Sequence, residues 1–314
     1  GNDPTPEFTI HSSEKGDITF GGGCSSTDNT TNGGNKDVTL SALASGGAYT
    51  CPISVTDKAG NTGSLSSPLH FVLDLEAPYV ESVNPPDNAP NIALDKSITV
   101  TFSEALNPAT VTVNTSGTDC DNGTISVSSD GFGSCLKMSG NPTSSDNIRF
   151  TVTLSDNMSE KTTYQIRIKT EISDSVGNAL GANPSSPSWL ASETGAYKTA
   201  NGFTTKDKTA PQISIHSLST LTNDNTTSVT FETNEAGRLT LSGPCNSPDH
   251  DTDIPKDNKT LTFGELADGI YSCTISVKDS AGLTGSENIN FKIDTRAPVL
   301  TGITPVPITT NDNS

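Results

Sequence analysis

Short segments in which apolar and polar residues alternate recur along the chain. Examples are "TSVTFET" at 227–233, "YSCTISVK" at 271–278 and "NINFKI" at 288–293. Alternation with a period of two predicts strands that bury one face. Turns rich in Asn, Asp and Gly separate these segments, and no long apolar stripe at helical spacing is found. About seven short strands in fewer than about 100 residues are typical of an immunoglobulin-like sandwich. The predicted fold class is therefore all-β.

The sequence also repeats itself over longer distances. Residues 8–24 align without a gap with residues 229–245, and "TNDN" at 222–225 recurs at 310–313. Such self-similarity indicates an array of whole domains. The middle segment is longer, with insertions near 114–147 and 182–200. We predict three immunoglobulin-like β-sandwiches in a linear, extended tandem array, over residues 1–77 (without a first strand), 78–207 and 208–297, with 298–314 beginning a further repeat.

The repeated motifs resemble those of known bacterial proteins. "ELADGIYSCTISVKDSAG" at 265–282, with "TNDN" upstream and "FKIDTRAP" downstream, is similar to the tandem Ig-like repeats of large surface adhesins and biofilm-associated proteins. "APYVESVNPPDNAPNIALDKSITVTFSEALNPATV" at 77–111 and "ISDSVGNAL" at 172–180 resemble the SbsA-type Ig-like domain of S-layer and other exported proteins. The resemblance implies an extracellular location, on the bacterial surface or secreted, and a use mainly as spacers; it does not specify a ligand.

Composition and charge narrow the choice of partners. The net charge of −18 argues against binding to nucleic acid and against docking on anionic lipid. No run of about 18 apolar residues is present, so no membrane insertion is predicted for this chain, and no signal peptide is present. Apolar residues make up only 31 % of the sequence, so each predicted core is thin. The chain begins and ends in polar sequence, and we expect it to be a segment of a longer protein.

Six cysteines are candidates for disulfides. Cys245 and Cys273 are expected on two neighbouring strands of one sheet, at the same end, and a bridge there is geometrically feasible. Cys24 and Cys51 occupy the equivalent positions of the first repeat. Cys120 and Cys135, in an insertion, would pair locally. Metal ligation and free thiols are the alternatives, although no Cys-x-x-Cys pair and no His at zinc spacing is found. Disulfides would place the chain in an oxidising compartment. Repeats of the resembled family usually lack cysteines.

Carboxylates recur where the predicted strands end. Topology places the end of one domain's last strand beside two loops of the next domain. Facing carboxylates there would repel, unless a Ca²⁺ ion with 6–8 oxygen ligands joined them; the resembled adhesin repeats, which bind Ca²⁺ between domains, imply the same. The candidate ligands are Asp74, Glu76, Glu104, Asp174, Asp207, Glu235, Asp279 and Asp294, with Asp3, Asp87 and Asp224 beside them. The alternative is that these side chains only cap turns.

A second calcium candidate is "PDHDTD" at 248–253. Asp249, Asp251 and Asp253 have the spacing of an EF-hand loop, but Ile254 stands where its glycine is expected and Thr260 where its closing Glu is expected.

The sequence contains no recognisable catalytic motif, and we predict that the chain is not an enzyme. Three of its four histidines, His11, His70 and His216, lie inside strand-like segments. Trp189, the only tryptophan, lies in an insertion, where it would either fill a core edge or bind a ligand.

Three functions are compatible with these observations. The first is a structural stalk segment of an exported adhesin, with the adjacent repeats of a parent chain as its partners. The second is a middle domain that binds a host or cell-surface glycan or protein. The third is an accessory region of a secreted enzyme. The tail Val299–Pro305 has the pattern of an unpaired first strand. We expect it either to be poorly ordered or to pair with the first domain of a neighbouring molecule.

Overall fold

The computed structural model describes residues 1–44, 46–182 and 197–304. In these residues the regular structure is β-strand, apart from one 3-10 turn at Pro108–Thr110. The chain is therefore all-β, as predicted. It forms two compact units, Gly1–Lys206 and Asp207–Ser314. No helix of the described residues is long and apolar enough to cross a membrane.

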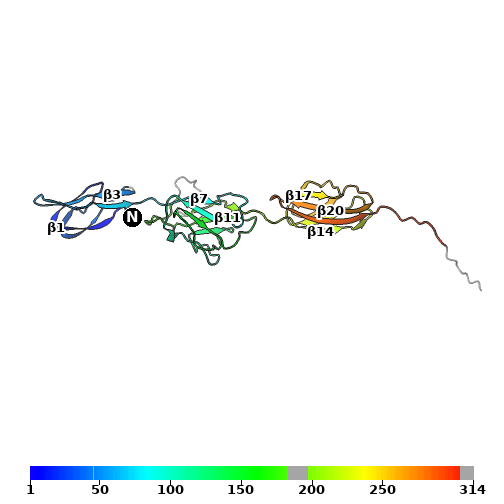
Figure 1. The fold of residues 1–314 in the computed structure, drawn as a ribbon, viewed down its shortest axis with the longest axis horizontal. Helices are drawn as coiled ribbons and strands as arrows, with labels where there is room; N and C mark the ends of the chain where they lie inside the picture. Colours follow the sequence, from blue (N-terminus) through cyan, green and yellow to red (C-terminus); the bar gives the residue numbers. More distant parts are fainter. Residues whose placement is uncertain (45, 183–196, 305–314) are drawn as a thin grey trace, which may run out of the picture. The chain divides into compact units, whose positions relative to one another are not determined.

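Unit 2 is a sandwich of two sheets (Figure 1). The first sheet has the order β14 (Ile213–Leu218), β16 (Ser228–Thr233), β19 (Asp257–Thr262). The second has the order β15 (Leu221–Thr222), β21 (Thr284–Ile293), β20 (Gly269–Lys278), β17 (Gly237–Ser242), β18 (Thr252–Ile254). Apolar residues of both sheets fill one core, in which Phe231, Leu261 and Ile275 are fully buried. The alternation of apolar and polar residues produces this core, because every second residue of each strand points inward between the two sheets.

The C-terminal part of unit 1 has a related arrangement. One sheet has the order β10 (Arg149–Val152), β8 (Ile98–Phe102), β7 (Val80–Asn84). The other groups β11 (Thr163–Ile168) with β9 (Ile125–Ser128), β12 (Tyr197–Lys198) and β13 (Phe203–Thr204). The largest core cluster of the described residues lies between them and includes Phe102, Phe150 and Phe203.

The N-terminal part of unit 1 is built from two smaller sheets. One has the order β2 (Thr30–Thr39), β1 (Glu7–Phe20), β4 (Ile53–Asp57), β5 (Thr62–Ser64), and the other pairs β3 (Gly47–Cys51) with β6 (Leu69–Leu73). The long strand β1 corresponds to β16 and β17 of unit 2 joined together, with a register shift between Ser12 and Lys15. The apolar side chains form two small clusters instead of one core.

All three predicted disulfides are present. Cys24–Cys51, Cys120–Cys135 and Cys245–Cys273 have Cα–Cα distances of 5.7, 5.1 and 6.0 Å. Cys273 lies in β20 and Cys245 follows its neighbour β17, as the repeat alignment indicated. Each bridge closes a loop of 15 to 28 residues, for which the chain-entropy estimate is about 3–4 kcal/mol. Cross-links of this strength matter most where the cores are small.

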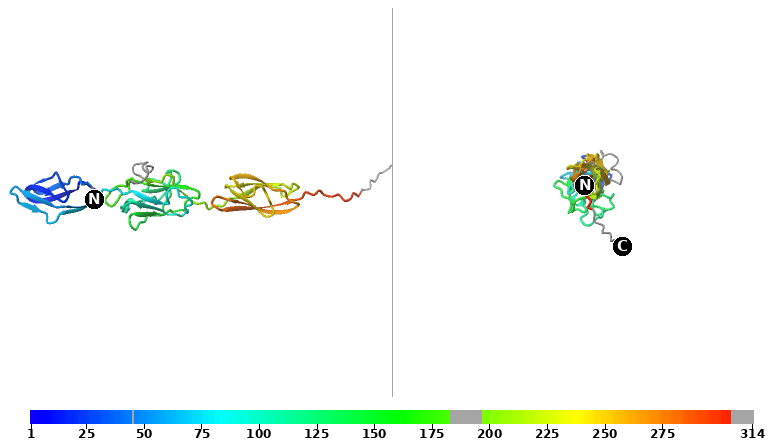
Figure 2. Two further views of the ribbon diagram at one scale, coloured as in Figure 1. Left: turned by 90° about the horizontal axis from the view of Figure 1, so that it is seen from above. Right: turned by 90° about the vertical axis from the view of Figure 1, so that its right-hand side faces the viewer.

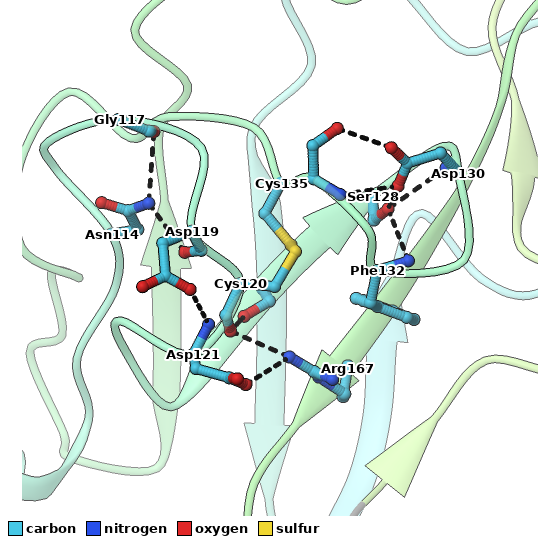
Figure 3. The surroundings of a disulfide bond; sticks show 12 residues. Asn114, Gly117, Asp119, Cys120, Asp121, Ser128, Asp130, Phe132, Cys135 and Arg167 are labelled. Carbon is cyan, nitrogen blue, oxygen red and sulfur yellow. Dashed lines mark hydrogen bonds and ion pairs between the residues drawn. A yellow bond between two sulfur atoms is a disulfide. The ribbon is translucent and has the colours of Figure 1, made fainter.

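The Cys120–Cys135 bridge joins two loops of the first insertion of the middle segment (Figure 3). Beside it, the Arg167 guanidinium of β11 donates to the Cys120 carbonyl oxygen at 2.9 Å and lies 4.6 Å from the centre of the Phe132 ring. Ser128 and Ser134 donate to the carboxylate of Asp130, at 2.8 and 2.6 Å. These contacts hold both ends of the loop.

Candidate metal centres

Three carboxylates meet at one place in unit 1. Asp74 follows β6, Glu104 follows β8, and Asp174 lies in the loop after β11. One oxygen from each lies within 4.8 Å of the others. Oxygens bound to one Ca²⁺ at about 2.3–2.6 Å are at most about 5 Å apart, so the spacing of these oxygens suits that ion. We call this group triad 1.

An equivalent group, triad 2, lies in unit 2. Asp207 opens the unit, Glu235 follows β16, and Asp279 follows β20, and their oxygens again lie within 4.8 Å of one another. The two triads use the same three positions of the repeat. In both units, therefore, the three chain segments that were predicted to lie together bring their carboxylates close to one another.

The buried member of each triad is held by its own loop. Asp174, only 2 % exposed, accepts through Oδ1 from the amides of Val176, Gly177 and Asn178, at 2.7 to 2.9 Å. Its Oδ2 accepts from the side-chain amide of Asn178 at 2.8 Å. Asn178 also donates to the carbonyl oxygen of Asp74 at 3.1 Å. The Asp-x-x-Gly turn thus fixes the carboxylate of Asp174, and the carboxylates of Asp74 and Glu104 lie close to it.

Triad 2 differs from triad 1 at one position. The residue four after Asp279 is Leu283 instead of an asparagine, and it donates only its backbone amide to Oδ1, at 2.9 Å. Asp279 is 8 % exposed, and its Oδ2 is buried with no hydrogen-bond partner. A buried carboxylate oxygen without a partner is costly. A bound cation would satisfy it, so the residues of triad 2 fit a metal ion.

Electrostatics distinguishes the members of triad 1. Burial first, and then the charges of Asp74 and Asp174, raise the pKa of Glu104. Burial also tends to raise the pKa of Asp174, but the hydrogen bonds from Asn178 and the turn amides outweigh it and lower that pKa. The negative charges of the three carboxylates therefore repel one another at this spacing.

Other predicted ligands lie elsewhere and cap turns. Asp3 accepts from the amide and hydroxyl of Thr5, at 2.8 and 3.0 Å, and Asp224 accepts in the same way from Thr226. The turn-capping alternative therefore describes Asp3 and Asp224. Asp87 instead accepts from the amides of Asn201 and Gly202, which lie in a loop distant in sequence.

Two further candidates stay outside the triads. Glu76 is exposed and donates its backbone amide to Asp74 Oδ1 at 3.1 Å, and its charge also raises the pKa of Glu104. Asp294 forms an ion pair with Lys292 at 2.9 Å and, within the described residues, joins no group of three carboxylates.

The EF-hand-like prediction at 249–253 is wrong. Asp251 and Asp253 form ion pairs with Arg238, at 2.7 and 3.5 Å, and Asp249 pairs with Lys259 at 3.1 Å. The strand pairing explains this, because β17 places Arg238 opposite Asp253. Trp189 lies outside the described residues.

Asn178 is a residue of the site that was not predicted from the sequence. It belongs to Asp-x-x-Gly-Asn, a pattern that also occurs at Asp57–Asn61 with the same hydrogen bonds from the asparagine side chain. The recurrence of this pattern could have identified Asn178 from the sequence. In triad 2 the pattern ends in Leu283 in place of the asparagine, so the side-chain hydrogen bond to the aspartate is missing there.

Several solved structures resemble the fold at low sequence identity. The N-terminal part of the bacterial S-layer protein SbsC is 17 % identical over 70 % of this chain and 44 % of its own, with a TM-score of 0.27. The protocadherin GammaB4 extracellular domain is 11 % identical over 93 % and 46 %, with a TM-score of 0.39. Mouse cadherin-23 EC22-24 is 12 % identical over 88 % and 86 %, with a TM-score of 0.31. This chain spans less than half of the length of the first two.

At the level of sequence, part of the chain matches one protein-family model. No curated protein matches the chain. Residues 74–194, which contain all three carboxylates of triad 1, match the family model of the bacterial Ig-like domain.

Proposed function

We propose that this chain is a structural segment of a large exported bacterial surface protein of the adhesin type, in which carboxylate triads bind Ca²⁺ and stiffen the connections between repeats. The chain has a non-catalytic role in this proposal. The three disulfides support an oxidising, extracellular setting. The Ig-like match over residues 74–194 supports a modular role outside the cell.

The single observation that carries the proposal is the recurrence of the triad at equivalent positions. In unit 1 it joins Asp74, at the end of one predicted domain, to Glu104 and Asp174 of the next. A bound Ca²⁺ would supply the positive charge that three carboxylates need. Asp74 would then be fixed to the following sandwich, and the short link 75–79 would lose much of its freedom. Asp207 would be fixed in the same way to the sandwich that it precedes.

Thermal unfolding with and without Ca²⁺ tests this proposal. For sites with Kd of about 10⁻⁴–10⁻³ M, about 10 mM Ca²⁺ should stabilise each triad by about 1.5–3 kcal/mol. We expect unfolding temperatures to rise in Ca²⁺ and to fall again in EDTA. Glu104→Gln and Asp279→Asn should each remove the gain for its own unit. Glu287→Gln, on an exposed position of β21, is the matched control. An equal Ca²⁺ response in all three variants would refute the proposal.

One observation favours the alternative that the middle segment binds a ligand. Phe132 adopts φ +71°, a conformation that is unusual for a bulky residue, and its ring lies beside the cationic groups of Arg167 and Lys198, at 4.6 and 5.9 Å. A strained aromatic flanked by two cations would suit an acidic glycan. Screening the whole chain and Phe132→Ala on a glycan array would test it, with loss of a specific signal in the variant as the supporting result.

A further inference from the structure

The two triads differ in the residue that stands four positions after the buried aspartate. In triad 1 this residue is Asn178, and in triad 2 it is Leu283. Both turns are closed by the same backbone hydrogen bond, from the aspartate amide to the carbonyl oxygen of that residue, at 3.1 Å for Asp174 and 2.9 Å for Asp279. Asp279 and Leu283 lie in the connection between β20 and β21, which run side by side in orange in Figure 2. The two loops are therefore ordered alike, and they differ in the side chain at this position.

In triad 1 the asparagine side chain contacts the buried aspartate. Asn178 donates from its side-chain nitrogen to Asp174 Oδ2 at 2.8 Å and to the carbonyl oxygen of Asp74 at 3.1 Å. Both partners only accept hydrogen bonds, so the orientation of the side-chain amide is fixed. Because the turn amides donate to Oδ1, each carboxylate oxygen of Asp174 has at least one donor. The negative charge of Asp174 is thus partly compensated before an ion binds.

In triad 2 the leucine leaves the same oxygen without a donor. Leu283 is partly exposed and has no side-chain donor, and the buried Oδ2 of Asp279 has no hydrogen-bond partner in the described part of the chain. An unpartnered buried carboxylate oxygen raises the free energy of the ion-free state. A bound cation removes this cost at triad 2, whereas at triad 1 the cation competes with the side-chain amide of Asn178. The free energy gained on binding is therefore larger at triad 2.

We propose that this position sets the Ca²⁺ affinity of each triad, so that Leu283 makes triad 2 the tighter site and Asn178 makes triad 1 the weaker one. The inference rests on the proposed function, because it ranks the two sites which that function requires. Asn178 also has an opposite effect, since its hydrogen bond to Asp74 positions a second ligand. Ordering one residue is worth less than a hydrogen bond to a charged group, so the competition for Asp174 dominates. As the Ca²⁺ concentration rises, triad 2 fills first and unit 2 is stabilised first.

Titration calorimetry with Ca²⁺ on swapped variants of the whole chain tests the proposal. Each triad is measured alone, because Glu104→Gln removes a ligand of triad 1 and Glu235→Gln removes one of triad 2. We expect the Kd of triad 2 to be about 10-fold lower than that of triad 1, the ratio that one hydrogen bond to a charged group is worth. Leu283→Asn should raise the Kd of triad 2 by a similar factor, and Asn178→Leu should lower the Kd of triad 1. The matched control is Leu221→Asn, the same change at a 65 % exposed position of β15, which should leave the Kd of triad 2 unaltered.

Thermal unfolding in EDTA gives a second measurement that needs no ion. Leu283→Asn should supply the missing donor to Asp279 and raise the unfolding temperature of unit 2 by about 4–8 °C, the shift for about one hydrogen bond in a domain of this size, whereas Leu221→Asn should not. Stabilisation in EDTA together with weaker Ca²⁺ binding supports the proposal. If Leu283→Asn gives no stabilisation in EDTA, or binds Ca²⁺ as tightly as before or more tightly, the proposal is overturned and the proposed function still stands. Absence of Ca²⁺ binding to the unaltered chain overturns both.

Discussion

Removing the disulfide of unit 2 should destabilise that unit by an amount that the structure allows us to estimate. Cys245 and Cys273 are separated by 28 residues. The chain-entropy relation gives about 3.6 kcal/mol at 25 °C for a loop of this length. A sandwich of about 90 residues has a total stability of about 5–13 kcal/mol. The bridge therefore supplies between about a quarter and most of the stability.

The perturbation is the double variant Cys245→Ala with Cys273→Ala. Both cysteines are buried in the core of unit 2, at 9 % and 2 % exposure, so lost packing adds to the entropic effect. With about 4–8 °C per kcal/mol for a domain of this size, we expect its unfolding temperature to fall by about 15–30 °C. Differential scanning calorimetry measures this change, because it resolves the transitions of separate units.

The matched control removes a bridge from the other unit. Cys120→Ala with Cys135→Ala should leave the transition of unit 2 in place and lower a transition of unit 1. If the Cys245 and Cys273 variant lost less than about 1 kcal/mol, the thin-core reasoning would fail, because the core alone would then suffice.

Two further predictions concern single positions. Gly237→Ala should destabilise unit 2 by about 1–3 kcal/mol, because its Cβ would lie 2.5 Å from the Lys278 carbonyl oxygen; Gly269→Ala, whose nearest contact is 3.8 Å, is the control in urea unfolding. Hydrogen bonds, from Ser134 above all, lower the pKa of Asp130 to about 2. Since the folded-state pKa lies below the unfolded one, this stabilisation is complete above about pH 4 and is lost as the pH falls through 2. Asp130→Asn should therefore lower stability more at pH 7 than near pH 2, and an equal loss at both would contradict the assignment.

The parts of the fold that depend on local pattern were predictable. Strands such as β20 follow from alternation, and the Cys245–Cys273 bridge follows from placing two repeat positions on neighbouring strands. The triads were predictable because the repeat shows which loops share an end of the sandwich. Of the eight predicted ligands, Glu76 and Asp294 lie outside the two groups.

The errors arose where distant residues decide the outcome. The spacing of Asp249, Asp251 and Asp253 suggested a calcium loop, but Arg238 and Lys259 reach these carboxylates from other strands. No local pattern reveals such partners. In the same way, the buried Oδ2 of Asp279 lacks a partner only because Leu283 replaces an asparagine, and that consequence requires the folded loop.

Titration calorimetry measures Ca²⁺ binding to the carboxylate triads without reference to stability. We expect binding to the whole chain at both triads, loss of one site in Asp279→Asn, and loss of the other in Glu104→Gln. Heats that are absent, or that stay the same in both variants, would show that these carboxylates do not hold the ion.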